Sequence, residues 1–327
     1  MTHEEFTNEL NKSIVNLINP KVFIEIIRKD NNLARFDIMN KIAICTMNNG
    51  EQFYDLKTAE EWAVCNRSVI DKKKRIYITV PKYDTHYIDC VSLEKVYINE
   101  FSQDEFVKAL ELGIIRRERN ITDVDVSTVY DIRNTSTIDK AHEYVVTKPK
   151  LSLDALINIM NQYMNLEVLP GEDETYYSKN SGKLFLAKNT YENMVKELVD
   201  ILVKHIIDNK LSGYVRNYLS NTEKELNKFE IELLKEALKY SICTIFNVLD
   251  ESNLLFEIRK NYVSDYSDIL DILILCDAIT FDISAFLDYS DNSLMTDAIN
   301  NIELIRKSDI LLSILQANSI LNKMKGI

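Results

Sequence analysis

The chain has 327 residues, of which 46% are hydrophobic and 28% charged, so it is long enough for one large or two ordinary globular domains. No stretch approaches the roughly 20 apolar residues that a membrane-spanning helix needs, and the acidic, polar start is unlike a signal peptide, so we expect a cytoplasmic protein without a membrane partner. The net charge of −12 is uneven: residues 1–150 carry 22 basic against 24 acidic side chains (−2) and residues 151–327 carry 17 against 27 (−10), so a polyanionic partner is expected to meet the first half.

Helices are predicted for much of the first half. Apolar residues recur at helical spacing over residues 2–18, and Pro20 is expected to separate this segment from further helices over 23–28 and 33–48. Thr58 is a predicted helix N-cap. Ser102, followed three residues later by Glu105, has the capping-box pattern and predicts a helix over 101–112.

The predicted strands of the first half are short. Four consecutive cations form what we call the basic turn: Lys72, Lys73, Lys74 and Arg75. This turn leads into a β-branched strand that is expected to end at Pro81. Residues 87–91 are its predicted hairpin partner, and residues 128–132 form another short strand.

The second half is predicted to be mostly helical. Only 6 glycines and 4 prolines occur in the chain, which favours helices joined by polar loops. After a linker at 148–150 we predict a helix over 151–165, a hairpin over 176–187 and long helices near 190–208, 223–248, 267–288 and 293–325. The predicted fold class is therefore α+β, with a mixed α/β domain over 1–150 and a mostly helical domain over 151–327.

The motifs of the first half occur in a recognisable order. Asn40 lies in a predicted helix and Trp62 follows. Next come the spaced residues Arg67, Val69, Lys74, Ile76 and Pro81, and later the segment VYDIRNT at 129–135. This order resembles the single-stranded-DNA-binding domain of the ArdC-type antirestriction family. The chain departs from the family at Lys72 and Arg75, where the family has glycine, so a flexible turn becomes a more basic one.

The second half resembles the metallopeptidase domain of the same family, with its HExxH helix altered. Lys196 and Asp200 stand where the two histidines would be, Glu197 is retained, and Glu236 matches a downstream acidic zinc ligand. Residues 261–263 (NYV) are similar to a further element of that domain. A protonated lysine cannot ligate zinc, and the five cysteines are widely spaced without a CxxC pair, so we expect a pseudo-metallopeptidase with no metal, cofactor or catalysis.

Two interpretations of Lys196 remain open. It forms an ordinary surface ion pair with Asp200 one helical turn away, or it enters the former metal pocket as the counter-ion of Glu197, Asp200 and Glu236. The second interpretation requires the Lys196 side chain to point toward Glu236.

The resemblance implies that single-stranded DNA is the partner. Single-strand binding combines a basic track with aromatic faces on which bases stack. The candidate DNA-binding residues are Asn40, Trp62, Arg67, Lys72, Lys73, Lys74, Arg75 and Tyr77. The alternative interpretation is that Trp62 is a core residue and that the basic turn is an ordinary solvated loop. Arg116, Arg117 and Arg119 form a second basic cluster with weaker support.

The expected function is that of a non-catalytic, antirestriction-like accessory protein of a bacterial plasmid, phage or conjugative element. One alternative is an acidic interaction module or DNA mimic that engages a host or plasmid-encoded protein. Another is a hydrolase with a rebuilt carboxylate site for manganese or magnesium.

Overall fold

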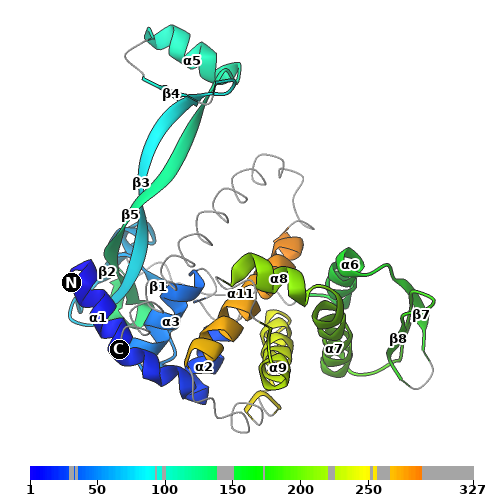
Figure 1. Cartoon of the computed structure of the whole chain (residues 1–327). Coiled ribbons are helices and arrows are strands. Elements are labelled where there is room, and N and C mark those ends of the chain that lie inside the picture. The colour runs from blue at the N-terminus through cyan, green and yellow to red at the C-terminus, as the bar shows by residue number, and fades with distance from the viewer. Residues whose placement is uncertain are drawn as a thin grey trace.

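A computed structural model describes residues 1–28, 33, 36–92, 94–97, 101–137, 151–171, 174–219, 225–250, 253–255 and 266–288. Helices and several small sheets are mixed, as predicted. Figure 1 shows a body of helices from which one long β-ribbon projects, with a short helix at its far end. The predicted linker at 148–150, the residues at 261–263 and the helix expected over 293–325 lie outside the described residues.

The N-terminal helices begin at polar caps. α1 (His3–Ser13) has a capping box, the 3-10 turn η1 (Ile14–Ile18) follows, and α2 (Pro20–Ile27) comes next. Pro20 is therefore the first residue of a helix, where its missing N–H costs nothing. α3 (Ile38–Met47) begins later than predicted because the Asp37 side chain accepts hydrogen bonds from two backbone N–H groups of its first turn.

The ribbon consists of two long antiparallel strands, β3 (Ile76–Asp89) and β5 (Ile115–Asp131). The sheet order is β1-β5-β3-β4, with β1 (Leu56–Lys57) at the base and β4 (Lys95–Val96) at the tip. The predictions that Pro81 ends the first strand and that residues 87–91 are its partner are both wrong. Pro81 lies within β3 opposite Val124, where β3 is bonded to β5 alone, and an edge strand tolerates a residue without an N–H.

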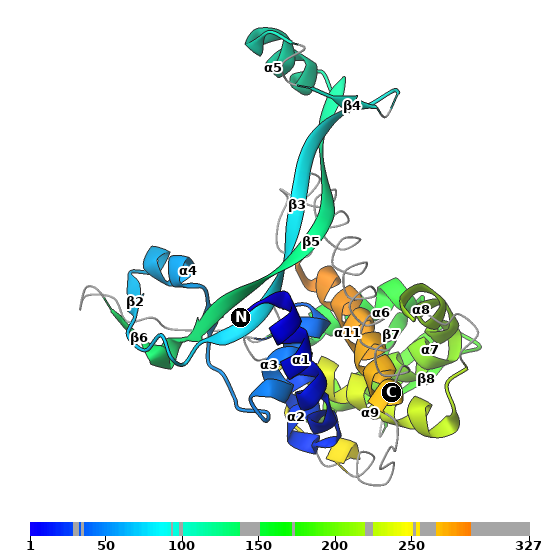
Figure 2. The same cartoon turned by 60° about the vertical axis from the view of Figure 1, so that its left-hand side comes forward.

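Short helices and strands lie at both ends of the ribbon. At the tip, α5 (Gln103–Glu111) starts at the capping box predicted from Ser102 and Glu105. At the base, α4 (Ala59–Val64) starts at the predicted cap Thr58, β2 (Arg67–Val69) pairs with β6 (Thr135–Thr137), and the turn η4 (Ile132–Asn134) joins β5 to β6. Figure 2 shows α4, β2 and β6 beside the base of the ribbon, on the side away from α9 and α11.

The second half is a helical layer with a small sheet. The predicted hairpin is present as β8 (Tyr176–Ser178) and β9 (Lys183–Leu186), and β7 (Glu167–Pro170) adds a parallel strand that the sequence pattern did not indicate. The described helices here are α6 (Leu153–Tyr163), α7 (Tyr191–Asn209), α8 (Leu211–Tyr218), α9 (Lys228–Ile245) and α11 (Tyr266–Asp288). Among the described residues, no helix is both long and apolar enough to cross a membrane.

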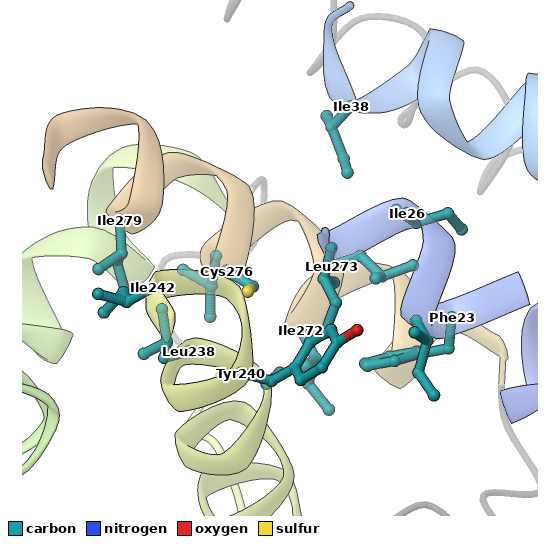
Figure 3. Packing of buried hydrophobic residues seen from close by; sticks show 14 of the residues in the cluster. Phe23, Ile26, Ile38, Leu238, Tyr240, Ile242, Ile272, Leu273, Cys276 and Ile279 are labelled. Atoms are coloured by element: carbon teal, nitrogen blue, oxygen red, sulfur yellow. The ribbon is translucent and has the colours of Figure 1, made fainter. Parts of the chain in front are cut away.

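One hydrophobic core runs through helices from both halves. Figure 3 shows Phe23 and Ile26 of α2 close to Leu273 of α11. Other residues of α11 pack against α9. Polar contacts cross the same boundary: the Ser241 hydroxyl donates to the Ile27 carbonyl at 2.7 Å, and Lys41 pairs with Asp277 at 2.6 Å. The helices on either side of residue 150 are therefore packed as one body, so experiments on function should use the full chain.

Candidate nucleic-acid interface

The basic turn lies between β2 and β3 and exposes all four of its cationic side chains. Asp71 shapes the turn: its carboxylate accepts from the Lys73 N–H at 3.0 Å and its carbonyl from the Lys74 N–H at 3.3 Å. Within the described residues, none of the four cations has a carboxylate within ion-pair distance. The turn is thus a concentrated positive charge held in a defined shape.

Tyr77 and Arg67 flank this turn in different ways. The Arg75 guanidinium lies 5.3 Å from the centre of the partly buried Tyr77 ring, a cation–π contact at the start of β3. Arg67, on β2, donates through Nε to the Thr135 hydroxyl at 2.7 Å, so it joins β2 to β6 and remains partly exposed.

Trp62 is fully buried, with 0% of its surface exposed. Its indole N–H donates to the Tyr130 carbonyl at 2.8 Å, and the cations of Lys57 and Arg67 lie 4.7 and 5.9 Å from its ring. A nucleobase cannot reach a ring that is already enclosed. The burial of Trp62 anchors α4 to β5 and favours its interpretation as a core residue over stacking on a base.

Asn40 is also buried, with 4% exposed. Its side chain donates to the Thr79 carbonyl at 2.8 Å and accepts from the Thr79 N–H at 2.7 Å, while Asp37 accepts a further bond from it at 2.6 Å. These bonds join α3 to β3 at Thr79, so the structure gives the buried Asn40 amide a structural partner in place of the DNA contact expected from its motif position.

Tyr54 and Arg133 form an exposed aromatic–cation pair that the sequence pattern did not indicate. Tyr54 is 59% exposed, and the Arg133 guanidinium lies 5.1 Å from its ring centre. The buried Asp131 holds both residues, since it accepts from the Tyr54 N–H at 2.8 Å and from Arg133 Nε at 2.7 Å. The hydrogen bond to Asp131, more than the opposing burial, raises the pKa of Arg133. The one available signal was the position of Arg133 inside the motif at 129–135.

On α7, Lys196 is placed differently from both interpretations. Its ammonium pairs with Asp250 at 2.8 Å, and the two side chains are 41% and 45% exposed. The hydrogen bond to Asp250 is the main cause that raises the pKa of Lys196. Lys196 thus forms neither the predicted pair with Asp200 nor the predicted contact with Glu236, because Asp250 approaches from after α9.

Lys239 is the cation that contacts Asp200 and Glu236, as the second interpretation expected of Lys196. Its ammonium lies 2.6 Å from Asp200 and 2.9 Å from Glu236, and Asp200 also pairs with Lys204 at 2.7 Å. Burial opposes ionisation of Asp200, but the hydrogen bonds from Lys204 and Lys239 lower its pKa overall. Lys239 can reach both carboxylates because it lies three residues after Glu236 on the same face of α9.

Glu197 lies apart from this cluster. One of its carboxylate oxygens accepts from the Asn189 amide at 3.3 Å, and the other is a buried atom with no hydrogen-bond partner among the described residues.

The residues at this place do not fit the zinc ion of a metallopeptidase. Lysines already neutralise Asp200 and Glu236, and a lysine in an ion pair stands at the first ligand position. Among the described residues, no group of three or more His, Cys, Asp or Glu side chains is placed to hold a metal ion.

Proteins similar to this chain are found among solved structures. No family model and no curated protein matches the chain. Among solved structures, it is similar to the antirestriction ArdC protein from the R388 plasmid, in its metal-free form (TM-score 0.40, 11% identity, 76% of this chain and 84% of that one) and its Mn(II)-bound form (0.39, 11%, 79% and 85%).

The chain thus resembles ArdC antirestriction protein structures over most of its length, as the order of its motifs predicted.

Proposed function

We propose that this protein binds single-stranded DNA, without catalysis, as an antirestriction-like accessory protein of a bacterial mobile element. The observation that carries the proposal is the basic turn: four adjacent, exposed cations with no ion-pair partner in the described part of the chain. The chain as a whole has a net charge of −12 and repels a polyanion. A phosphate backbone is therefore expected to be attracted chiefly where cations are concentrated and unneutralised.

Single strands fit this arrangement better than a duplex. A protein that reads a duplex usually inserts a helix or a two-stranded ribbon into the major groove. The ribbon here is poorly suited because the basic cluster on β5 (Arg116, Arg117 and Arg119) is offset by Glu118, Asp123 and Asp125 on the same strand. Glu118 lies 3.6 Å from His86 and 3.7 Å from Arg116. A compact basic turn beside tyrosine–guanidinium pairs instead matches the combination of charge and stacking used on single strands.

The absence of catalysis is proposed from the chemistry of the altered helix. An active zinc peptidase of this kind needs two neutral imidazoles and an acidic third ligand on the metal, and a further carboxylate as base beside its bound water. Here Lys239 is the cation between Asp200 and Glu236, and a metal ion would have to displace it. The helical half is then a scaffold that supports the DNA-binding half through their common core.

The cellular role rests on the order of the sequence motifs. The resemblance to the antirestriction family implies protection of an incoming single strand from nucleases. The competing role, an acidic second half that engages a host protein, predicts that protection survives the loss of DNA binding. A conjugation assay into a recipient carrying a restriction system separates the two: charge reversal of the basic turn should abolish protection in the first case and leave it intact in the second.

The direct test is a salt titration of binding to a labelled single-stranded oligonucleotide, measured by fluorescence anisotropy on the full-length protein. Replacing all four cations of the basic turn with glutamate should abolish binding. If each cation contacts one phosphate, the wild-type plot of log K against log salt should include a slope of about −2.8 from this turn.

A matched control changes the net charge equally at four exposed lysines elsewhere: Lys108, Lys188, Lys210 and Lys228. This control should retain most of the affinity, because surface charges beyond a Debye length of about 8 Å are largely screened at physiological salt. Equal loss of binding in both variants would show that net charge alone matters. Unchanged binding in the basic-turn variant would remove the proposal.

A further inference from the structure

A solvent-open depression of about 410 Å³ lies near the base of the ribbon. It is lined by Lys21 at the start of α2, by Asn48 and Asn49 at the end of α3, and by Tyr54 and Arg133, together with Glu51 and Gln52. Its volume falls within the roughly 300–1,000 Å³ of small-molecule sites.

The backbone around the depression is closely packed. Asn49 and Gly50 both adopt positive φ angles, 53° and 67°. A Cβ on Gly50 would lie 3.1 Å from the backbone nitrogen of Val22, so only glycine lets the chain pass this close to α2. The end of α3 is thereby held against the start of α2, and the side chains between them are presented from a fixed frame.

Polar groups that face this site have unused hydrogen-bonding capacity. Asn48 donates through Nδ2 to the Ile44 carbonyl at 2.7 Å, which leaves its Oδ1 as an acceptor. Asn49 accepts through Oδ1 from Asn16 at 3.0 Å, which leaves its Nδ2 as a donor. Within the described residues these two atoms, and the ammonium of Lys21, have no bonded partner.

Tyr54 and Arg133 supply a flat surface at the same depression. Arg133 is held by Asp131 at 2.7 Å, by Glu51 at 3.2 Å and by the Gln52 carbonyl at 3.1 Å. Its guanidinium covers part of Tyr54, of which 59% remains exposed. Unpaired bases stack on aromatic rings and on arginine planes and are then read along their hydrogen-bonding edges. A simple anion is a poorer fit, because the carboxylate of Glu51 lines the site.

The depression and the basic turn are joined by a short stretch of structure. The Ile70 N–H donates to the Asn134 carbonyl at 3.0 Å, so the residue after Arg133 is bonded to the residue two before Lys72. From this bond and standard backbone lengths, the Cα atoms of Arg133 and Lys72 are at most about 18 Å apart. One strand can therefore reach both places.

We infer that this depression is a nucleobase subsite of the bound single strand. The base lies against the Tyr54–Arg133 pair, its edge meets Asn48 Oδ1 and Asn49 Nδ2, and Lys21 lies near the adjoining phosphate. This inference rests on the proposed binding of single-stranded DNA and adds to it a contact that the phosphate backbone alone cannot satisfy.

The test compares a deoxythymidine oligomer with an abasic oligomer of the same length and charge. Wild type should bind the base-containing oligomer more tightly, and Tyr54→Ala should lose about 5- to 150-fold of that affinity, the equivalent of one stacked base. The slope of affinity against salt should stay unchanged in Tyr54→Ala because no charge is removed. Tyr97→Ala, which removes a tyrosine with 57% exposure just after β4, is the matched control and should bind as wild type does.

A second measurement does not depend on a variant. Photo-crosslinking of the wild-type protein to an oligomer containing 5-iododeoxyuridine should give an adduct on residues 48–54 or on Arg133. If the basic turn proves essential but Tyr54→Ala and the abasic oligomer bind normally and no such adduct forms, the subsite is refuted and the proposed function stands. If wild type binds neither oligomer, both proposals fail.

Discussion

Lys239→Met should destabilise the fold much more than Lys196→Met. Lys239 lies within hydrogen-bonding distance of Asp200 and Glu236, and all three side chains are largely buried, with 23%, 32% and 13% exposed. Methionine keeps the length and apolar stem of lysine but removes its charge. The two carboxylates would then remain in a poorly solvated place with only Lys204, which contacts Asp200, to compensate them.

The size of the effect follows from these exposures. Leaving a fully buried charge without its partner costs about 3–5 kcal/mol. Here Asp200 keeps Lys204 and is one-third exposed, so we expect the free energy of unfolding to fall by about 2 kcal/mol. Lys196 and Asp250 are 41% and 45% exposed, and pairs of that kind contribute only about 0–1 kcal/mol.

The pH dependence gives a second signature. The pKa of Asp200 is lowered in the folded state, so its stabilising contribution is present above the unfolded pKa of about 3.9 and is lost as pH falls through the folded value. Burial lowers the pKa of Lys239, but its hydrogen bonds to Asp200 and Glu236 raise that pKa overall. The stabilising contribution of Lys239 is therefore kept until the pH rises through its folded-state pKa. The difference between wild type and Lys239→Met should therefore be largest between about pH 5 and 9 and shrink below about pH 4.

Urea unfolding followed by circular dichroism, at pH 7 and at pH 3.5, measures both quantities. The triple variant Lys239→Met, Asp200→Asn, Glu236→Gln is the matched control and should recover much of the lost stability, since it removes the uncompensated charges. The reasoning would be refuted if Lys196→Met cost as much as Lys239→Met, or if the loss at Lys239 did not change with pH.

Two further predictions concern Trp62 and Asn40, the two buried residues among the candidates for DNA binding. Trp62→Phe should lower the free energy of unfolding by about 1–3 kcal/mol, because the Tyr130 carbonyl loses the indole donor and a small cavity forms. The affinity of the folded protein for single-stranded DNA should stay within twofold of wild type. A large loss of affinity without loss of stability would contradict the structure. Asn40→Ala should cost about 2–3 kcal/mol and speed hydrogen exchange at the Thr79 amide, which donates to Asn40; unchanged protection of that amide would show that the bond is not formed.

Interactions between residues close in the chain were predictable. The caps at Thr58 and Ser102 are confirmed, because a cap is decided by a side chain and the N–H groups within three residues of it. The hairpin over 176–187 is confirmed for the same reason. Strand pairing at a distance was not predictable: residues 76–89 pair with residues 115–131, across an intervening helix, and the local pattern around Pro81 favoured a shorter strand.

The features of the candidate site also separate into those that the sequence alone determined and those that the tertiary structure decided. The sequence by itself determined where positive charge is concentrated, because the four cations of the basic turn are consecutive and no fold can separate them. It also determined that no histidine stands at residue 196 or 200, the two positions that correspond to the histidines of an HExxH motif. Only the tertiary structure decided which polar side chains meet: Lys239 rather than Lys196 neutralises Asp200 and Glu236, Trp62 is enclosed, and Tyr54 with Arg133 is exposed. Burial and charge pairing depend on residues far apart in the chain, and the position of a residue in a motif does not specify them.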